Sequence, residues 1–455
     1  MKKYNSYKST KIEFLDTIPE KWEEKRLRFI GYLYGGLTGK VANDFNQSDK
    51  EGNKYFIPFT NIAGNLKIDC NKLQQVVIDE EEMQNEVRMG DLFFLMSSED
   101  YEDIGRSSVL INDLHETYLN SLCKGFRITH SEINPEFLNY HLHSKQLRHN
   151  LLTQANGFTR INLKIGKVQD LYVAFPSKQD QTAIADYLDR KTAAIDDLIE
   201  DKKRLLQLYE EEKQAVIDEL VTGKKVWNGK EWTKPQEVKD SGIEWLGEIP
   251  KDWEVRKLKY VALTYPSNVD KKSRDDEENV LLCNYMDVYK NDFISSDLKF
   301  MQATASYNQI RKFELNEGDV LVTKDSERPD DIAIPSLVKD ELDNLICGYH
   351  LNLIRPVELI GNFLFRFLQS KYSTSYFYCA SNGVTRFAVG AEKFSNFLIL
   401  KPTQEDQKDI INKIEKETNR INHKINNTNR LIDLLQEYRQ ALISEVVTGK
   451  VKVTD

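Results

Sequence analysis

The chain has 455 residues, of which 40% are hydrophobic and 10% aromatic, so it is long enough for two or three globular domains and is not a disordered protein. It contains no run of 18 apolar residues and begins with a polar stretch, which argues against a membrane protein or a secretory signal and predicts a cytoplasmic location. The formal net charge of −9 does not exclude a nucleic-acid partner, because most of the acidic excess lies in one segment. Residues 179–222 carry 6 Lys and Arg against 12 Asp and Glu, so the rest of the chain is closer to neutral.

Cysteine and histidine give no sign of a disulfide framework or a metal site. The 5 cysteines are odd in number and no two stand at C-x-x-C spacing, so we expect neither bridges nor zinc. His141 and His143 are two residues apart in a predicted helix and therefore point to different faces. We interpret both as ordinary polar positions, and we expect no metal and no cofactor in this chain.

The first predicted domain, residues 1–178, combines strands with helices. Apolar runs rich in β-branched and aromatic residues predict strands at 55–62 and 91–96. A helical pattern of apolar residues covers 135–150. The segment is therefore predicted to be a mixed α and β domain.

A long helix is predicted over residues 179–223. Its apolar residues alternate at spacings of four and three, and neither Pro nor Gly interrupts the stretch between Pro176 and Gly223. This pattern predicts a coiled-coil seam of about four to five heptads. The predicted seam positions are Ile184, Leu188, Lys191, Ile195, Leu198, Lys202, Leu205, Tyr209, Glu212 and Val216.

A polar linker, residues 224–245, leads to a second predicted domain, residues 246–403. This domain also has apolar runs that predict strands, at 319–323 and 396–401, and a helical pattern at 361–372. We therefore expect a second mixed α and β domain.

The last predicted element is a second long helix, residues 404–449, which repeats the seam of the first. A helix of about 44 residues is roughly 66 Å long, which exceeds the width of one small domain. The simplest partner of each helix is the other one, and equivalence of the two predicts an antiparallel pair whose register is fixed by the polar positions Lys191 and Glu417. The alternative is that each helix packs on its own domain. The predicted seam positions are Ile410, Ile414, Glu417, Ile421, Lys424, Thr428, Leu431, Leu435, Tyr438 and Leu442.

The sequence contains two copies of one unit. The opening block at 8–27, which contains IPEKW, returns at 239–258 with IPKDW, and GFTR at 157–160 returns as GVTR at 383–386. Between these blocks Gly90-Asp91 matches Gly318-Asp319, and the helix end VTGK occurs twice. Because the order is constant and the offset drifts only between 231 and 226, we infer an internal duplication. The predicted fold class is α+β, with two mixed domains, each followed by a long helix.

Taken together, the paired blocks resemble the specificity subunit of type I restriction-modification systems. The resemblance rests on the IPEKW and IPKDW openings, the two Gly-Asp pairs, the helix starts FPSKQDQ and KPTQEDQ, and the VTGK ends. In that family the helix start usually carries Glu-Gln, where this chain has Asp180-Gln181 and Asp406-Gln407. The resemblance covers nearly the whole chain.

The resemblance implies a non-catalytic subunit that binds double-stranded DNA. Two target-recognition domains would each read one half of an asymmetric, bipartite site, and the helices would space them and dock two methyltransferase subunits. Restriction subunits would complete the enzyme. The partner subunits are expected to use S-adenosylmethionine, ATP and Mg²⁺, and this chain none of them. Half-sites read from one face of DNA lie about one helical turn apart, which a rigid helix pair could set.

Three loops are candidates for DNA contact. The paired GFTR and GVTR turns place Thr159 and Arg160 in positions equivalent to Thr385 and Arg386. A Gly-led loop that presents a hydroxyl and a guanidinium suits phosphate or the guanine edge. The alternative reading is that this turn only joins two elements.

The second candidate follows the Gly-Asp strands, where Ser97 and Ser98 match the segment that holds Lys324 and Ser326. The third is the loop of residues 35–40, in which Thr38 and Lys40 could reach DNA. That loop does not fit a phosphate-binding P-loop, because Tyr34 stands where a Gly is needed and Val41 replaces the Ser or Thr after the Lys.

The sequence carries none of the common catalytic motifs. The sequence has no HExxH, no GxSxG and no Gly-rich cofactor loop between a strand and a helix.

The competing hypothesis is a helical scaffold protein with two protein-binding domains and no role on DNA. The two hypotheses differ in the expected effect of salt, because binding through several phosphates weakens steeply as salt rises.

Overall fold

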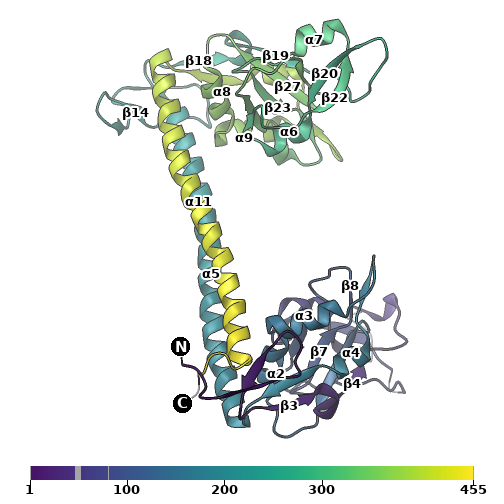
Figure 1. The fold of residues 1–455 in the computed structure, drawn as a ribbon. Coiled ribbons are helices and arrows are strands. Elements are labelled where there is room, and N and C mark those ends of the chain that lie inside the picture. The colour runs from purple at the N-terminus through teal and green to yellow at the C-terminus, as the bar shows by residue number, and fades with distance from the viewer. Residues whose placement is uncertain (1, 47–52, 80, 454–455) are drawn as a thin grey trace. The chain divides into compact units, whose positions relative to one another are not determined.

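The computed structural model describes residues 2–46, 53–79 and 81–453, and the chain folds into two compact units (Figure 1). Unit 1 comprises residues 1–202 and 429–455, and unit 2 comprises residues 203–428. Each unit contains one mixed α and β domain together with half of each long helix, α5 (Lys178–Val221) and α11 (Gln404–Val447).

The domain of unit 1 is built on two small sheets. One has four antiparallel strands in the order β4–β11–β7–β9, and the other has the order β10–β5–β6, with β10 parallel to β5. Three antiparallel pairs, β1–β2, β3–β13 and β8–β12, complete the domain. The strands are β1 (Tyr7–Ser9), β2 (Thr17–Pro19), β3 (Glu23–Arg26), β4 (Gly31–Gly35), β5 (Asn53–Ile57), β6 (Gln74–Val77), β7 (Leu92–Leu95), β8 (Ser97–Ser98), β9 (Ser107–Val109), β10 (Thr117–Leu119), β11 (Cys123–Ile128), β12 (Ile161–Asn162) and β13 (Tyr172–Phe175). The helices are α1 (Phe59–Gly64), α2 (Pro135–Leu142), α3 (Lys145–Thr153) and α4 (Ile165–Gln169).

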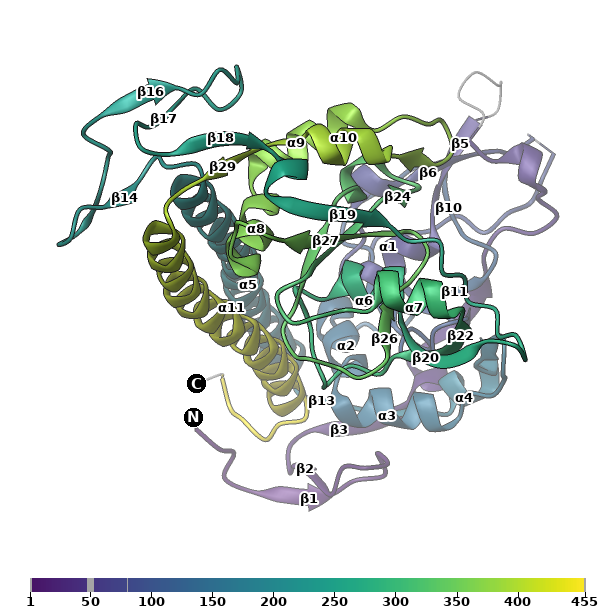
Figure 2. The ribbon, with the colours of Figure 1, turned by 90° about the horizontal axis from the view of Figure 1, so that it is seen from above.

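Unit 2 repeats this topology with one strand more in its larger sheet, and Figure 2 labels its strands β19, β20, β22, β26 and β27. Its larger sheet has the order β19–β27–β23–β25–β21 and its smaller one the order β22–β20–β26, again with one parallel neighbour, β26 beside β20. The strands are β14 (Val226–Trp227), β15 (Trp232–Thr233), β16 (Val238–Asp240), β17 (Glu248–Pro250), β18 (Glu254–Lys257), β19 (Ala262–Pro266), β20 (Glu278–Cys283), β21 (Phe293–Ile294), β22 (Met301–Ala305), β23 (Val320–Thr323), β24 (Asp325–Ser326), β25 (Pro335–Val338), β26 (Leu345–Cys347), β27 (Leu351–Pro356), β28 (Phe387–Ala388) and β29 (Leu398–Lys401). The helices are α6 (Tyr285–Lys290), α7 (Tyr307–Phe313), α8 (Gly361–Leu368), α9 (Lys371–Ala380) and α10 (Ala391–Asn396).

The structure confirms the strands predicted near 91–96 and 319–323 and corrects three other elements. The strand predicted at 55–62 ends at Ile57, because Pro58 begins helix α1. The helix predicted at 135–150 is two helices, since the hydroxyl of Ser144 caps the second one by accepting from the N–H of Leu147. Ser370 interrupts the helix predicted at 361–372 in the same way.

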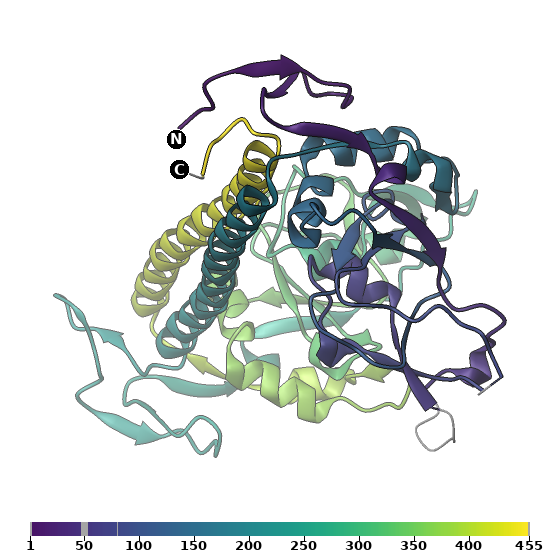
Figure 3. The ribbon, with the colours of Figure 1, turned by 90° about the horizontal axis from the view of Figure 1, so that it is seen from below.

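The repeated blocks IPxxW and VTGK pack against each other within a unit. A Cβ at Gly449 would lie 2.4 Å from Pro19, and one at Gly223 would lie 2.4 Å from Pro250, so only glycine fits at these helix ends. Trp22 and Trp253 are both buried beside them. Each unit therefore joins its opening block to the end of the helix that follows the other domain. Figure 3 shows the two chain ends side by side in unit 1, where Lys2 and Lys452 form a β-bridge.

The Gly-Asp pairs have a structural role. The carboxylate of Asp91 is 2% exposed and accepts two hydrogen bonds from the guanidinium of Arg127, at 3.0 and 2.7 Å. Asp319 and Arg355 repeat this bidentate pair in unit 2, at 2.9 and 2.6 Å. A buried ion pair with such geometry fixes the turn before each central strand.

The glutamines at the two helix starts are buried and make equivalent contacts. The side-chain oxygen of Gln181 accepts from the N–H of Asn134, and its amide donates to the carbonyl of Pro176. Gln407 makes the same pair of bonds, with Ile360 and Pro402. This side chain ties each long helix to the domain that precedes it, so the Glu-Gln position of the family is kept at its Gln.

The long helices pair antiparallel in each unit. In unit 1 the beginning of α5 lies beside the end of α11, and the guanidinium of Arg439 is 2.8 Å from the carboxylate of Asp196. In unit 2 the end of α5 lies beside the beginning of α11, and Arg420 contacts Glu212 at 2.6 Å. The antiparallel coiled coil expected from the sequence is confirmed.

The seam itself differs from the predicted one at several positions. Ile199 is buried whereas the predicted Leu198 is 40% exposed, and Thr192 is buried whereas the predicted Lys191 is exposed. The same shift by one residue occurs in α11, where Thr418 is buried in place of Glu417. Lys191 and Glu417 are therefore not buried in the seam, whereas among the described residues of the two helices Thr192, Thr418 and the predicted Thr428 are. Among the described residues, no helix is long and apolar enough to cross a membrane.

Candidate nucleic-acid interface

The GFTR and GVTR turns have the same geometry. Each is closed by a pair of backbone hydrogen bonds, Asn156 with Asn162 in unit 1 and Asn382 with Ala388 in unit 2. A Cβ at Gly157 would lie 2.0 Å from the carbonyl oxygen of Arg160, so the turn requires glycine at its first position. The side chains that follow the glycine are exposed, and each turn presents Thr and Arg to solvent.

The structure joins the second group of candidates to these turns. Strand β8, with Ser97 and Ser98, pairs with β12 directly after the first turn, and β24 pairs with β28 directly after the second. Two of the three predicted groups therefore form one surface in each unit. We call these surfaces turn patch 1 and turn patch 2. Turn patch 1 is made of residues 97–98 and 157–162, and turn patch 2 of residues 324–326 and 383–388.

The two equivalent arginines have different surroundings. Arg160 is exposed and has no ion pair with a residue that the structure describes. Lys164 and Lys167 follow it, equally exposed and without an ion pair in the described part of the chain. Arg386 instead donates from Nε and Nη2 to Oδ1 of Asp325, at 2.9 and 2.5 Å. The positive charge of turn patch 1 is thus free, and that of turn patch 2 is partly neutralised.

The remaining candidates of turn patch 2 are held by neighbours. The ammonium of Lys324 donates to the carbonyl of Ser267 at 2.7 Å and lies 4.5 Å from the ring centre of Tyr349. Burial lowers the pKa of this lysine. The hydroxyl of Ser326 donates to none of the turn residues and lies 3.3 Å from the hydroxyl of Tyr285.

The serines of turn patch 1 are less exposed than the turn. Ser98 is 7% exposed and its hydroxyl accepts from the N–H of Asp100 at 3.0 Å. The hydroxyl oxygen of Ser97 is buried and lacks a hydrogen-bond partner. Both serine hydroxyls are thus less accessible to a ligand than the side chains of the turn.

The third predicted loop is bound to another segment of unit 1. Lys40 pairs with Glu82, and the ion pair leaves its side chain only 8% exposed. The backbone of Thr38 exchanges two hydrogen bonds with the side-chain amide of Gln84, at 3.1 and 2.8 Å. The cation of Lys40 already has its partner, and the hydroxyl of the exposed Thr38 donates to Oε1 of Gln84 at 3.4 Å.

Three residues in or beside turn patch 2 were not identified from the sequence. Asp325 and His350 contact Arg386, and Tyr349 stacks on the edge of His350 with ring centres 4.4 Å apart. The carboxylate of Asp325 is separated from Arg386 by 61 residues and from His350 by 25. A local pattern could not reveal these pairs, although Asp325 does occupy the position of Ser97 in the repeat.

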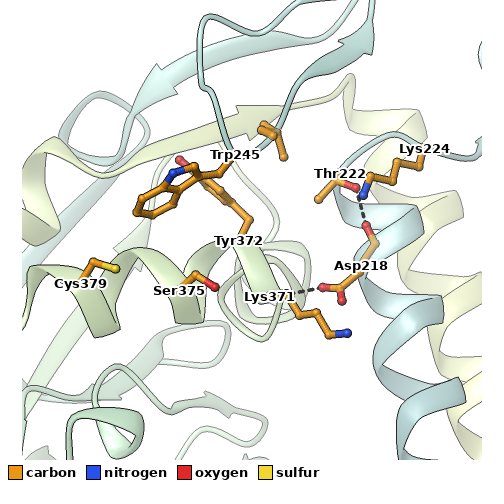
Figure 4. A pocket seen from close by; sticks show the side chains of 9 residues that line it. Asp218, Thr222, Lys224, Trp245, Lys371, Tyr372, Ser375 and Cys379 are labelled. Atoms are coloured by element: carbon orange, nitrogen blue, oxygen red, sulfur yellow. Dashed lines mark hydrogen bonds between the residues drawn. The ribbon is translucent and has the colours of Figure 1, made fainter.

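A cavity of about 440 Å³ lies in unit 2, between the end of α5 and helix α9 (Figure 4). The N–H of Lys371 donates to the carboxylate of Asp218 at its floor, at 2.7 Å, while Trp245 and Tyr372 line one side. In unit 1 Phe14, which matches Trp245 in the repeat, contacts the ring of His149 edge to face with ring centres 4.4 Å apart. The cavity belongs to the scaffold at the helix end, not to either turn patch.

The described residues contain no cluster of three or more His, Cys, Asp or Glu able to hold a metal ion. The two turn patches carry exposed polar turns on short hairpins, which suit recognition of an extended anionic ligand.

The comparisons with known proteins agree with this organisation. The type I restriction modification DNA specificity domain matches the chain twice, at residues 19–208 and 250–428. The chain is also similar to a putative type I restriction enzyme MjaX specificity subunit of Methanocaldococcus jannaschii, with 23% identity over 99% of this chain and 98% of that protein.

Two solved structures share the fold. The HsdS subunit of Thermoanaerobacter tengcongensis is 15% identical, with a TM-score of 0.55 over 95% of this chain and 98% of that one. A chain from a structure that describes complex assembly and conformational transition of the type I R-M system is 13% identical, with a TM-score of 0.71 over 95% of this chain and 99% of that one. Since the domain match covers most of the sequence in two copies, the chain belongs to the type I restriction modification DNA specificity family.

Proposed function

We propose that this chain is the DNA-reading subunit of a type I restriction-modification enzyme, in which each unit reads one half of a bipartite, asymmetric site. The observation that carries the proposal is the presence of two copies of one specificity domain whose scaffold contacts are the same and whose turn patches differ. Two identical readers would select a palindrome, whereas two different readers select an asymmetric site.

The scaffold residues support a division between frame and reader. The ion pairs of Asp91 and Asp319, and the buried Gln181 and Gln407, are equivalent in the two units and face away from solvent. The turn patches keep their backbone geometry and change their side chains. Sequence is read by side chains that reach base edges, so variation confined to these turns would change the half-site without disturbing the fold.

The long helices are proposed to dock two methyltransferase subunits and to set the gap between the half-sites. In unit 1, Leu431, Leu434 and Tyr438 lie on one face of α11 and are 40%, 51% and 50% exposed. Leu198 on α5 is exposed to a similar degree. Exposed apolar side chains grouped on a helix pair are typical of a protein interface. Restriction subunits would join this complex.

The chemistry is assigned to the partners. The methyltransferase subunits are proposed to use S-adenosylmethionine, and the restriction subunits ATP and Mg²⁺, while this chain binds double-stranded DNA and no cofactor. We infer that the protein acts in the cytoplasm. The free cations Arg160, Lys164 and Lys167 provide phosphate contacts for unit 1.

The salt dependence of binding tests this function. The complex of the chain with its methyltransferase subunit, titrated with fluorescent duplexes between about 50 and 200 mM salt, should lose affinity by orders of magnitude if several phosphates are contacted. It should also prefer one duplex sequence over shuffled ones. Binding that is absent, or that does not change with salt, would contradict the proposal and favour a scaffold that binds only proteins.

A further inference from the structure

A cluster of three residues is formed by Arg386 and Asp325 of turn patch 2 and by the adjacent His350. The guanidinium of Arg386 donates from Nε and Nη2 to Oδ1 of Asp325, and its Nη2 lies 3.0 Å from Nδ1 of His350. The same Nδ1 is 2.7 Å from the Asp325 carboxylate, so each of the three groups contacts the other two. The side chain of Asp325 is 12% exposed, that of His350 32% and that of Arg386 55%.

These contacts use one edge of the guanidinium and leave another open. Nε and Nη2 are engaged on the side that faces Asp325, while no hydrogen bond of Nη1 to a described residue is found. Nη2 also lies against His350, so the two N–H groups of Nη1 are the donors left free at the outer end of the planar fork, where they can reach O6 or N7 of guanine. A carboxylate on the Nε side fixes the plane of that fork and leaves the end with Nη1 pointing outward.

An arginine side chain that is held in place before binding loses less conformational entropy when it contacts a base. A free arginine side chain must lose rotamer freedom when it binds a base, and a held one has already lost it. The half-exposed Arg386 stands on a hairpin whose turn is closed by two backbone bonds, so both its backbone and its plane are preorganised. Such an arrangement favours a directional contact with a base edge over a contact with phosphate, which requires no fixed plane.

Unit 1 lacks the cluster at the equivalent positions. With the offset of 228 that relates the Gly-Asp blocks, Ser97 takes the place of Asp325 and Leu122 that of His350. Neither side chain can hold a guanidinium as a carboxylate does, and Arg160 accordingly has no ion pair with a described residue. The flanking Lys164 and Lys167 add positive charge, which suits the DNA backbone.

We propose that Asp325 and His350 are positioning residues that hold Arg386 to read a guanine in the half-site of unit 2, whereas the equivalent Arg160 of unit 1 contacts the DNA backbone. The inference rests on the proposed function and adds the base read, the residue that reads it and the residues that orient it. It also assigns different roles to two arginines that occupy equivalent places in the repeat.

The test uses the complex of the full chain with its methyltransferase subunit and duplexes in which each base pair of the recognised site is changed in turn. The chain itself supplies the matched variants: D325S and H350L give unit 2 the residues of unit 1. We expect D325S and R386K to lower the preference for guanine at one and the same base pair by about tenfold to a hundredfold. H350L should cause a smaller loss at that base pair, and no other position should change.

The second readout separates positioning from a general structural effect. In the R386K background, D325S should cause no further loss of base preference, because the group that it orients is no longer a fork. R160A should lower affinity for all duplexes alike and reduce the salt slope by about one. Circular dichroism and urea unfolding of each variant show whether it is folded.

Three results would overturn the inference while leaving the proposed function intact: D325S that folds and keeps every base preference, R386K that keeps them all, or R160A that changes preference at a single base pair. A wild-type complex that prefers no duplex over another would instead contradict the proposed function itself. The two failures are therefore distinguishable in one set of titrations.

Discussion

At the scale of single residues, the aspartates of the Gly-Asp motifs show how a repeated pattern can be structural. Asp91 and Asp319 follow glycines with positive φ, of 91° and 87°, and each receives a bidentate guanidinium from a strand that is distant in sequence. The N–H three residues earlier also donates to each carboxylate, at 2.9 Å in both units. The motif thus closes a turn and joins two strands, which explains its presence in both copies.

Removing this carboxylate should destabilise unit 2. We expect Asp319→Ala to lower the free energy of unfolding by roughly 2–4 kcal/mol, because Arg355 would lose its partner in a largely buried site. Urea unfolding followed by circular dichroism measures the change. Asp330→Ala is the matched control, since Asp330 forms an exposed pair with Arg328 and should leave the unfolding midpoint unchanged. Equal effects of the two variants would contradict the structural role.

His141 makes unit 1 sensitive to acid. Burial lowers its pKa from 6.5 to about 4, and its Nε2 accepts from the N–H of Ala174. The unfolded state binds the proton more readily, so stability that is present above pH 6.5 is lost as the pH falls from 6.5 toward 4. The interpretation of His141 as an ordinary polar position was wrong, because the side chain is completely buried.

We expect the urea midpoint of unit 1 to fall between pH 6.5 and 4, with a loss of about 2 kcal/mol by pH 5 from this group. The chain offers the control, because buried Phe367 takes the place of His141 in unit 2. His141→Phe should remove about half of that pH dependence, because burial also lowers the pKa of His143 from 6.5 to about 4. A variant as acid-sensitive as the wild type would show that other groups are responsible.

The candidate site was predictable only in its local part. The turn residues follow from a short motif that occurs twice, and the structure joins them to the strands after the Gly-Asp pairs. The cluster of Asp325, His350 and Arg386 brings together side chains 25 to 61 residues apart, which no spacing rule connects. Lys40 was a candidate for DNA contact, and its ion pair with Glu82, which is 42 residues away, could not be inferred from the loop itself.

At the scale of elements, the long helices were predictable and the details of their seam were not. Their bounds, Lys178–Val221 and Gln404–Val447, agree with the prediction to within two residues. The seam was assigned one residue early at alternate positions because apolar residues are adjacent at 198–199 and 431–432. A 4–3 spacing and a 3–4 spacing then fit equally well, and only packing decides between them.

Adjacent residues of α5 provide a sharp test of this seam. We expect Ile199→Asp to destabilise unit 1 by roughly 2–4 kcal/mol, because a carboxylate would replace a buried side chain that is 7% exposed. Leu198→Asp, at a position 40% exposed, should have little effect on urea unfolding. If Leu198→Asp destabilised the protein more than Ile199→Asp, the seam predicted from the sequence would be the correct one.

Short elements were less predictable than long ones. The apolar run at 55–62 indicated one strand, but Pro58 ends it and the remaining residues form helix α1. The strand order of the sheets, including the parallel neighbours β5 with β10 and β20 with β26, depends on contacts distant in sequence. The duplication did indicate correctly that both units would share whatever topology one of them has.

At the scale of the whole molecule, the sequence repeat and the compact units are offset. The repeat consists of a domain and the helix that follows it, whereas each compact unit contains the end of the helix that follows the other domain. The packing of Gly449 on Pro19 and of Gly223 on Pro250 accounts for this arrangement. The paired VTGK and IPxxW blocks therefore serve as contact surfaces for each other.

If the helix pair sets the gap between half-sites, a longer helix pair should give a longer gap in the recognised sequence. Seven residues added to each helix near its middle lengthen the pair by about 10 Å, which corresponds to roughly three base pairs. We expect the gap to grow by that amount while both half-sites stay the same. Insertion of seven residues in α5 alone is the control and should disrupt pairing. An unchanged gap in a folded double insertion would show that the helices are not the spacer.

The most direct test of the account is a map of methylated adenines in DNA from cells that express this chain with its partner methyltransferase subunit. The account predicts one motif made of two different short half-sites separated by a fixed gap, and replacement of residues 1–178 by the equivalent segment of a relative should change only one half. A single continuous motif, a palindrome, or a change in both halves after that replacement would contradict it.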